Sequence, residues 1–476
     1  MSFRKYLLTL FLLPAALSVK AQQSNILTLQ QCVDIAIKNN LQVKQNGLNM
    51  QADSVNFLQA KENLLPAINA NASRSISQGR TINPVTNTYV NQGLTSDNYG
   101  INGSLTLFSG LANQNFIKQT RLAYQAGKMD FQAAKDIVTL NIITQYLTVL
   151  DDEEQLAQTK TQLALAKETL DRSTILEKEG DNPTASTIYD LKGSYSGTLV
   201  SIVSAQDAVI SAKVLLYQYL NLPYDKNAEL QPLNAEDMKG EHGADPNDVY
   251  QTALQQLAEV KSATLKRESA EKGVKQAQGL LFPTLALTGG INTNYSSAGQ
   301  RSVFVDSAST NTGEYINTPT GRQPVYATEA NYANQNISYI NQFKNNYGTS
   351  VGLTLNIPIL DYHQKKNAIA LAKINLEGYR DLEDNTKIQL QQQIEQTYYN
   401  MTAAYNRYQA LQDEVAAYTE SFRISKIRFE AGVLTSVDYI TSKNNMDAAN
   451  LNLISAQYDY FIYSKVLDYY QGKLAF

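Results

Sequence analysis

The chain consists of one unit that occurs twice, and this duplication limits its possible folds more than any other feature of the sequence. Pro66 recurs 217 positions later as Pro283, and Gly180 recurs 252 positions later as Gly432. The pairs that share these two offsets include Ala36/Ala253, Val43/Val260, Leu64/Leu281, Tyr146/Tyr398 and Lys213/Lys465. The two offsets differ by 35, so the second copy carries an insertion between Pro283 and about residue 357.

Each copy contains two segments in which apolar residues alternate with small polar ones, a pattern that predicts β-strands. In one of them, Leu353, Leu355 and Ile357 alternate with Thr354 and Asn356. Each segment has about 10 residues, the length that a tilted strand needs to cross a membrane, although a half-buried soluble sheet would show the same pattern. Four strands cannot close a barrel and open edges are not tolerated in lipid, so several chains must contribute. The two predicted hairpins span about 67–107 and 284–357.

Proline-free segments with apolar residues three and four positions apart predict long packed helices. Two of these helices have about 68 residues and a length of about 100 Å, and the others are about half as long. An isolated helix of that length has nothing to bury, so each must pack along partners. The long helices are expected at 111–179 and 363–430, the shorter ones at 28–64, 184–220, 248–281 and 435–471.

The N-terminus has the pattern of an export signal, with a basic start, an apolar run and a small-residue exit. We therefore divide the chain into a signal peptide (1–21), a first structural repeat (22–220), an equatorial connector (221–247) and a second repeat (248–476). No later run approaches 18 continuous apolar residues, so no transmembrane helix is expected. A lipid anchor is not expected either, because Cys32 lies inside the mature chain.

The sequence contains no arrangement of residues that predicts an enzyme. The two histidines, His242 and His363, lack metal-ligand spacing, and there is no phosphate-binding glycine loop or nucleophile motif. No cofactor and no metal are expected. The net charge of −4 argues against a nucleic-acid partner, while 30 tyrosines suit a membrane–water interface.

Several short segments, in the same order in both copies, resemble those of the TolC family of outer-membrane channel-tunnels. They are Ala36–Asn40, Leu64–Pro66, Leu105–Gly110, Leu353–Asp361 and Phe429–Gly432. The resemblance covers nearly the whole mature chain and implies an α+β membrane protein. In this fold four strands from each chain of a homotrimer form a 12-stranded outer-membrane barrel, and the helices form a periplasmic coiled-coil α-helical barrel.

The same resemblance implies a function in transport across the outer membrane. The expected partners are outer-membrane lipid, a periplasmic adaptor (membrane fusion) protein and an inner-membrane RND- or ABC-type transporter, for multidrug efflux or type I secretion. Two alternatives remain open at this point. One is a trimeric outer-membrane stalk or adhesin without transport activity, and the other is an outer-membrane enzyme such as a barrel lipase.

The resemblance also implies a periplasmic aperture close to the corners between the long and shorter helices. The family's acidic constriction maps onto Asp438, its second acidic position onto Thr441, and the corner's basic partner onto Leu434. Ser186 faces Asp438 in the first copy, and Tyr189 lies on the same helix, so both are also aperture candidates. Asp438 could instead be a first-turn acid that favours the helix dipole. A ring of three carboxylates would attract cations.

The corners themselves have two compatible interpretations. Glycine at a corner accepts the left-handed conformation that ends a helix, and in the family the corners contact the adaptor. The adaptor-contact candidates are Gly180, Asp181, Asn182, Gly432, Val433 and Leu434.

Two outer loops, 78–97 and 296–346, connect the predicted strands. The second could fold over the mouth as a lid, but a disordered polar loop is the default expectation. Arg74, near the outer end of the first strand, could meet lipid phosphate or extend its charge to the interface.

Overall fold

The structure, a computed structural model, describes residues 26–82, 87–91, 93–180, 184–232 and 245–473. The expected signal peptide lies outside these residues. The chain divides into two compact units. We call them the helical unit, which comprises Met1–Ala52, Tyr124–Lys266 and Arg380–Phe476, and the strand unit, which comprises Asp53–Ala123 and Arg267–Tyr379.

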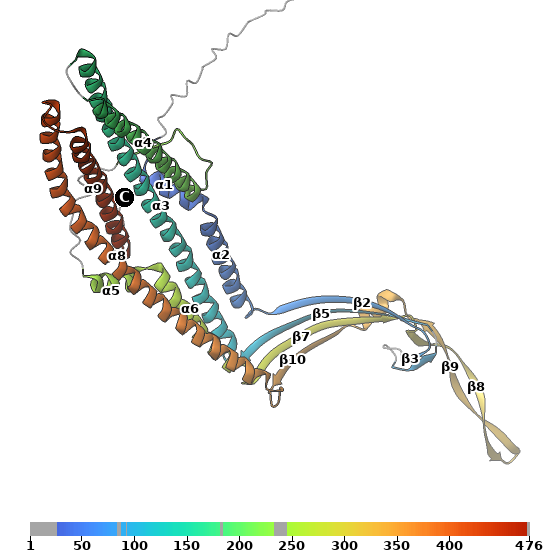
Figure 1. Cartoon of the computed structure of the whole chain (residues 1–476). Coiled ribbons are helices and arrows are strands. Elements are labelled where there is room, and N and C mark those ends of the chain that lie inside the picture. The colour runs from blue at the N-terminus through green and yellow to red at the C-terminus, as the bar shows by residue number, and fades with distance from the viewer. Residues whose placement is uncertain (1–25, 83–86, 92, 181–183, 233–244, 474–476) are drawn as a thin grey trace, which may run out of the picture. The chain divides into compact units, whose positions relative to one another are not determined.

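Apart from the short helix α7, which has no counterpart in the first half, helices and strands follow one another in the same order in both halves of the chain (Figure 1). The helices are α1 (Leu29–Asn39), α2 (Leu41–Glu62), α3 (Ala112–Glu179), α4 (Ala185–Leu220), α5 (Pro246–Gln256), α6 (Ala258–Gly279), α7 (Tyr339–Asn345), α8 (Gln364–Glu430) and α9 (Ser436–Tyr470). The strands are β1 (Ile26–Leu27), β2 (Ala67–Ser77), β3 (Arg80–Ile82), β4 (Tyr89–Asn91), β5 (Leu94–Ser109), β6 (Glu229–Leu230), β7 (Thr284–Ser296), β8 (Gln300–Thr318), β9 (Gly321–Asn336) and β10 (Gly348–Asn356).

The first helix of each copy is broken, where the sequence predicted one continuous helix. Asn40 separates α1 from α2 and adopts a non-helical ψ of 125°, and Leu257 separates α5 from α6 with a ψ of 133°. Leu257 lies 217 positions after Asn40, so the break belongs to the duplicated unit. The side-chain oxygen of Asn40 accepts hydrogen bonds from the backbone N–H groups of Gln42 and Val43, at 2.8 and 3.1 Å, and thereby caps α2.

Among the residues that the structure describes, three apolar clusters hold the helical unit together. The largest joins α1, α3, α4 and α9 around Ile142, Tyr146 and Leu216, none of which is exposed. A second joins α5, α6, α8 and α9 around Ile394. A third joins α4, α8 and α9 around Tyr439. The hydroxyl of Tyr146 donates to the backbone oxygens of Leu27 (3.0 Å) and Gln231 (2.8 Å), which secures the parallel pair β1–β6 against α3.

The strand unit contains a four-stranded antiparallel sheet in the order β10-β7-β5-β2, whose strands run side by side in Figure 1. Along each strand, apolar residues point to one face and small polar residues to the other. β5 has 16 residues, longer than the sequence predicted, and a bulge between Thr106 and Phe108 shifts its register with β7. Strands β2 and β10 are the two edges of this sheet.

The long second loop is structured, so the default expectation of a disordered loop was wrong. Strands β8 and β9 form an antiparallel hairpin with two irregularities, and α7 follows it. Gln342 anchors the base of this hairpin, because its buried side chain accepts from Ser296 N and donates to the backbone oxygens of Ser296 and Ile337, each at 2.9 Å. Tertiary hydrogen bonds, which the sequence pattern does not display, therefore order this segment.

Among the described helices, α4 alone is long and apolar enough to cross a membrane by length and composition. The sequence contains no run of 18 continuous apolar residues there, because serine, threonine and four charged residues interrupt it. Several large apolar side chains of α4 are exposed, among them Val200 (67% exposed) and Val203 (65%).

Candidate functional site

The corner between α8 and α9 is a helix stop built on a left-handed glycine. Gly432 has φ +77° and donates its N–H to Phe429 O at 3.0 Å, and Val433 donates to Arg428 O at 3.0 Å. These two bonds form a Schellman motif. A side chain at Gly432 would meet open space, so only the backbone conformation restricts this position. Val433 is 66% exposed at the tip of the corner.

The corner between α3 and α4 also has a glycine with positive φ. Gly180 has φ +86° and donates to Glu177 O at 3.2 Å, again with open space where a side chain would lie. Asp181 and Asn182, two of the predicted adaptor contacts, lie outside the described residues. Thr184 precedes α4 and its hydroxyl is 3.0 Å from that of Thr187.

Asp438, the predicted constriction acid, interacts with the start of its own helix. Its backbone N–H donates to Thr435 Oγ1 at 3.1 Å, and the Thr435 hydroxyl donates to Asp438 Oδ2 at 2.7 Å. A carboxylate in the first turn also favours the positive end of the helix dipole. The structure therefore supports the local interpretation of Asp438, while the residue remains exposed and available for a ring.

The other aperture candidates are exposed at the beginnings of α4 and α9. Ser186 is exposed, Tyr189 is 72% exposed, and Thr441 donates its hydroxyl to Val437 O of its own helix at 2.8 Å. A hydrogen bond that the sequence did not suggest joins these two helix starts. It runs from Ser436 Oγ to Asp190 Oδ2, at 2.8 Å.

An apolar cluster lies directly behind the corners. Leu191, Phe422 and Tyr439 form its buried centre, and Leu434 packs against them. Where the family resemblance places a basic partner, this chain therefore has an apolar contact. The Tyr439 ring stacks on Phe429 with 4.6 Å between ring centroids, and its hydroxyl lies 2.9 Å from that of Thr169 on α3. Burial raises the pKa of Tyr439 above its usual value.

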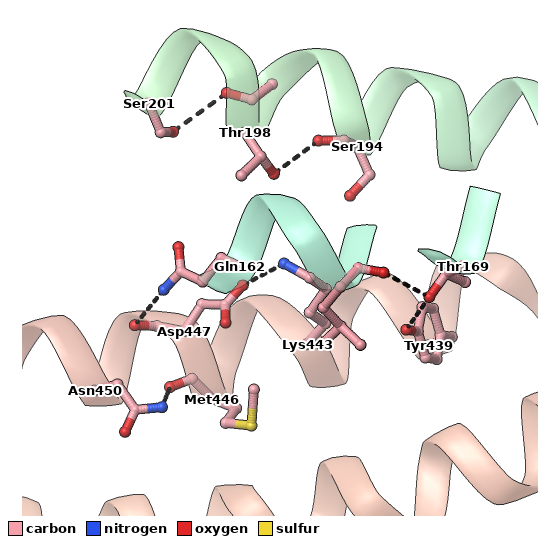
Figure 2. A network of polar contacts seen from close by, with 12 residues as sticks. Gln162, Thr169, Ser194, Thr198, Ser201, Tyr439, Lys443, Met446, Asp447 and Asn450 are labelled. Atoms are coloured by element: carbon pink, nitrogen blue, oxygen red, sulfur yellow. Dashed lines mark hydrogen bonds and ion pairs between the residues drawn. The ribbon is translucent and has the colours of Figure 1, made fainter. Parts of the chain in front are cut away.

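A buried ion pair follows on the same face of α9, as Figure 2 shows. Lys443 and Asp447 contact each other, and their side chains are only 3% and 12% exposed. Gln162 on α3 donates to the backbone oxygen of Asp447 at 3.5 Å. Burial raises the pKa of Asp447 although Lys443 acts in the opposite direction. The i,i+4 spacing of Lys443 and Asp447 was the only sequence signal for this pair.

Arg74 pairs with Asp97 on the neighbouring strand, a contact that neither interpretation from the sequence included. Its Nε and Nη2 atoms donate to the two carboxylate oxygens of Asp97, each at 2.7 Å. This bidentate pair lies directly across β2 and β5 in the register of the sheet. Both of the interpretations offered from the sequence were therefore incomplete.

Comparison with known proteins assigns the chain to a family. The family model described as "Outer membrane efflux protein" matches residues 249–470. Outer membrane protein TolC of Escherichia coli (strain K12) is 22% identical over 462 residues, which cover 95% of this chain and 83% of the relative. The protein of the same name from Salmonella enteritidis is 20% identical over 465 residues, or 96% and 84% of the two chains. The chain belongs to the TolC-like outer-membrane efflux proteins.

Solved structures show that this TolC-like chain has the predicted fold. The outer membrane protein VceC of Vibrio cholerae superposes with a TM-score of 0.74 at 13% identity, covering 93% of this chain and 96% of VceC. The Campylobacter jejuni CmeC outer membrane channel superposes with a TM-score of 0.71 at 17% identity, covering 94% and 86%. The predicted TolC-like α+β fold, outer-membrane location and non-enzymatic transport role are confirmed. The stalk and lipase alternatives are not supported.

Proposed function

We propose that this TolC-like efflux channel works as a homotrimer in a tripartite pump, joined by a periplasmic adaptor to an inner-membrane RND- or ABC-type transporter. The channel class follows from the family. The stoichiometry and the partners are the proposal.

The observation that carries the proposal is the open sheet of the strand unit. β2 and β10 each pair on one side only within the described chain, and the apolar face between them is exposed. In lipid, unpaired backbone groups at an edge cost several kcal/mol each, so β10 of one copy must pair with β2 of the next. Three copies would supply twelve strands.

The helical unit supports the same conclusion independently. The exposed apolar side chains of α4 have no cover in a single chain, and patches of this kind mark protein interfaces. A neighbouring copy would bury them. The exposed side chains concerned are Leu199, Val200, Val203, Ile210 and Val214.

The proposal is tested on purified protein and in a deletion strain. Native mass spectrometry should give a trimer, and the protein should conduct ions in a planar bilayer. The strain should become sensitive to exported drugs and regain resistance with the gene. A monomer, or a trimer without current, would contradict the proposal. A strain that keeps its resistance but no longer secretes a protein would assign type I secretion instead.

A further inference from the structure

The polar face of the four-stranded sheet carries no charge. The only charged residues in β2, β5, β7 and β10 are Arg74 and Asp97. Both side chains lie on the apolar face. Asp97 and Ile101 are four residues apart in β5 and so point to the same face, and Arg74 lies directly opposite Asp97 in β2. Ile68 (70% exposed) and Val351 (84%) belong to that face too. Outer-membrane barrels turn their apolar face to lipid, so the uncharged face lines the interior.

Asparagines occupy this interior face, and glycines on the neighbouring strands make room for them. Gly100 lies between Asn71 and Asn292 in the register of the sheet. A Cβ atom at Gly100 would lie 2.5 Å from Asn292 Oδ1 and 2.8 Å from Asn71 Oδ1. Gly290 has the same relation to Asn102, whose Oδ1 would be 2.5 Å from an added Cβ. The side-chain amides of these asparagines therefore lie over the backbone of the neighbouring glycines instead of projecting into the interior of the barrel.

The same face forms an open hollow near the start of β10. The hollow has a volume of about 380 Å³, and its side chains are neutral. Among the residues that line it are Asn71, Asn98, Asn292, Asn294 and Ser350. Asn102 Nδ2 donates to Asn71 Oδ1 at 3.1 Å, so neighbouring amides hold one another in place.

We infer that the barrel wall of this chain is a charge-free amide surface that takes polar solutes by hydrogen bonding, whatever the sign of their charge. This inference rests on the proposed function, because it needs a closed barrel. An amide offers both donors and acceptors without a net charge. Neutral and mixed-charge solutes can therefore pass, and any ion preference of the channel arises in the helical unit.

Engineered cysteines test the inference, because the native thiol of Cys32 is not expected to react with the labelling reagents. Cys32 is fully buried, and burial raises its pKa to about 12. Asn102→Cys and Asn292→Cys are treated with a cationic and an anionic methanethiosulfonate reagent in outer-membrane vesicles. The cationic-to-anionic rate ratio should stay within about three-fold of that of a free small thiol. Ala70→Cys, on the lipid-facing side of β2, should label much more slowly.

A positive control shows that the assay detects charge. Adding Asn292→Asp to Asn102→Cys should raise the ratio several-fold, because cations then concentrate near the thiol. The inference would be overturned if the cationic-to-anionic rate ratio of both single variants differed about ten-fold from that of the free thiol. Faster labelling of Ala70→Cys than of Asn102→Cys would overturn it too. If the folded protein is labelled without charge preference but carries no current in a bilayer, the inference about the barrel wall holds and the channel proposal is overturned.

Discussion

Gly432 and Asp438, at the corner between α8 and α9, have local structural roles that are separate from transport. Gly432 supplies the left-handed backbone that ends α8, and Asp438 completes the hydrogen bonds that begin α9. Because neither role requires a charge in the bore or contact with an adaptor, substitutions can separate structure from function at both positions.

Replacing Gly432 by valine should weaken adaptor-dependent export more than trimer assembly. A β-branched residue in the left-handed region costs about 1–2 kcal/mol, which would distort the corner but meets no steric obstacle there. Drug susceptibility and the yield of membrane-inserted trimer are the measurements. Gly432→Asn is the matched control, because asparagine tolerates this backbone and should keep export. Equal loss of assembly and export in Gly432→Val would show a folding role only.

Asp438→Asn should reduce the preference of the channel for cations and leave assembly intact. Asparagine keeps an oxygen that accepts from Thr435, so the hydrogen bond survives while three charges disappear from the trimer. The reversal potential in a salt gradient measures the change, with the exposed Asp171→Asn in α3 as control. An unchanged reversal potential in Asp438→Asn would reject the acidic ring.

At the scale of elements, the contact between α3 and α9 contains buried polar groups as well as apolar side chains. Lys443 and Asp447 are buried there, and Asp447 Oδ1 has no hydrogen-bond partner among the described residues. Buried pairs of this kind contribute little net stability but are costly to break from one side. The pair therefore makes the α3–α9 contact sensitive to single substitutions.

Lys443→Met should destabilise the protein by about 3–5 kcal/mol, because it leaves Asp447 buried without its cation. The double variant Lys443→Met/Asp447→Leu should recover most of that loss. Thermal unfolding followed by circular dichroism measures both. Arg423→Met is the control: it breaks the exposed pair with Glu420 and should leave the thermal stability nearly unchanged. A double variant as unstable as Lys443→Met would contradict the explanation.

The stability of the folded protein should also depend on pH through a buried acid in α3. Burial raises the pKa of Asp151 from 3.8 to about 6. The folded state thus prefers the protonated acid, and stability is lost as pH rises from about 4 to about 6. Asp151→Asn keeps the oxygen that accepts from Gln155 Nε2 and removes the charge. Relative to wild type, it should gain about 1–2 kcal/mol more at pH 7.5 than at pH 4, after allowance for solvent screening. A gain equal at both pH values would refute this.

At the scale of the whole molecule, the β8–β9 hairpin has little tertiary support beyond its base. Both of its faces are exposed along most of its length, and two-stranded hairpins are marginal by themselves. Its attachment is firm, however, because Gln342 holds its base and Ile337 N donates to Gly299 O at 2.9 Å. We therefore expect the channel to tolerate loss of the hairpin.

Replacing residues 301–335 by a short glycine turn should leave conductance and drug resistance within about two-fold of wild type, since exposed loop tips tolerate such changes. Gln300 and Asn336 face each other in the register, with 2.9 Å between Gln300 Nε2 and Asn336 Oδ1, so a turn can join them. Gln342→Ala is the contrasting variant and should disorder the hairpin base. Loss of conductance in the deletion would show that the hairpin belongs to the conducting path.

The sequence by itself determined the duplicated plan and the types of the main elements, and its resemblance to the TolC family implied the fold class. The element types follow from local signals: alternation at period two, proline-free runs with apolar spacing of three and four, and glycines such as Gly180 and Gly432 at helix stops. Each signal lies within a few residues of the structure it specifies.

Only the tertiary structure decided the break at Leu257, the folded β8–β9 hairpin, the partner of Arg74 and the burial of Lys443. Leu257 is neither glycine nor proline and is buried, so packing rather than propensity ends α5 there. Arg74 meets Asp97 across a hairpin, and Lys443 is buried because α3 covers α9. These contacts join residues that are distant along the chain, so a local pattern does not contain them.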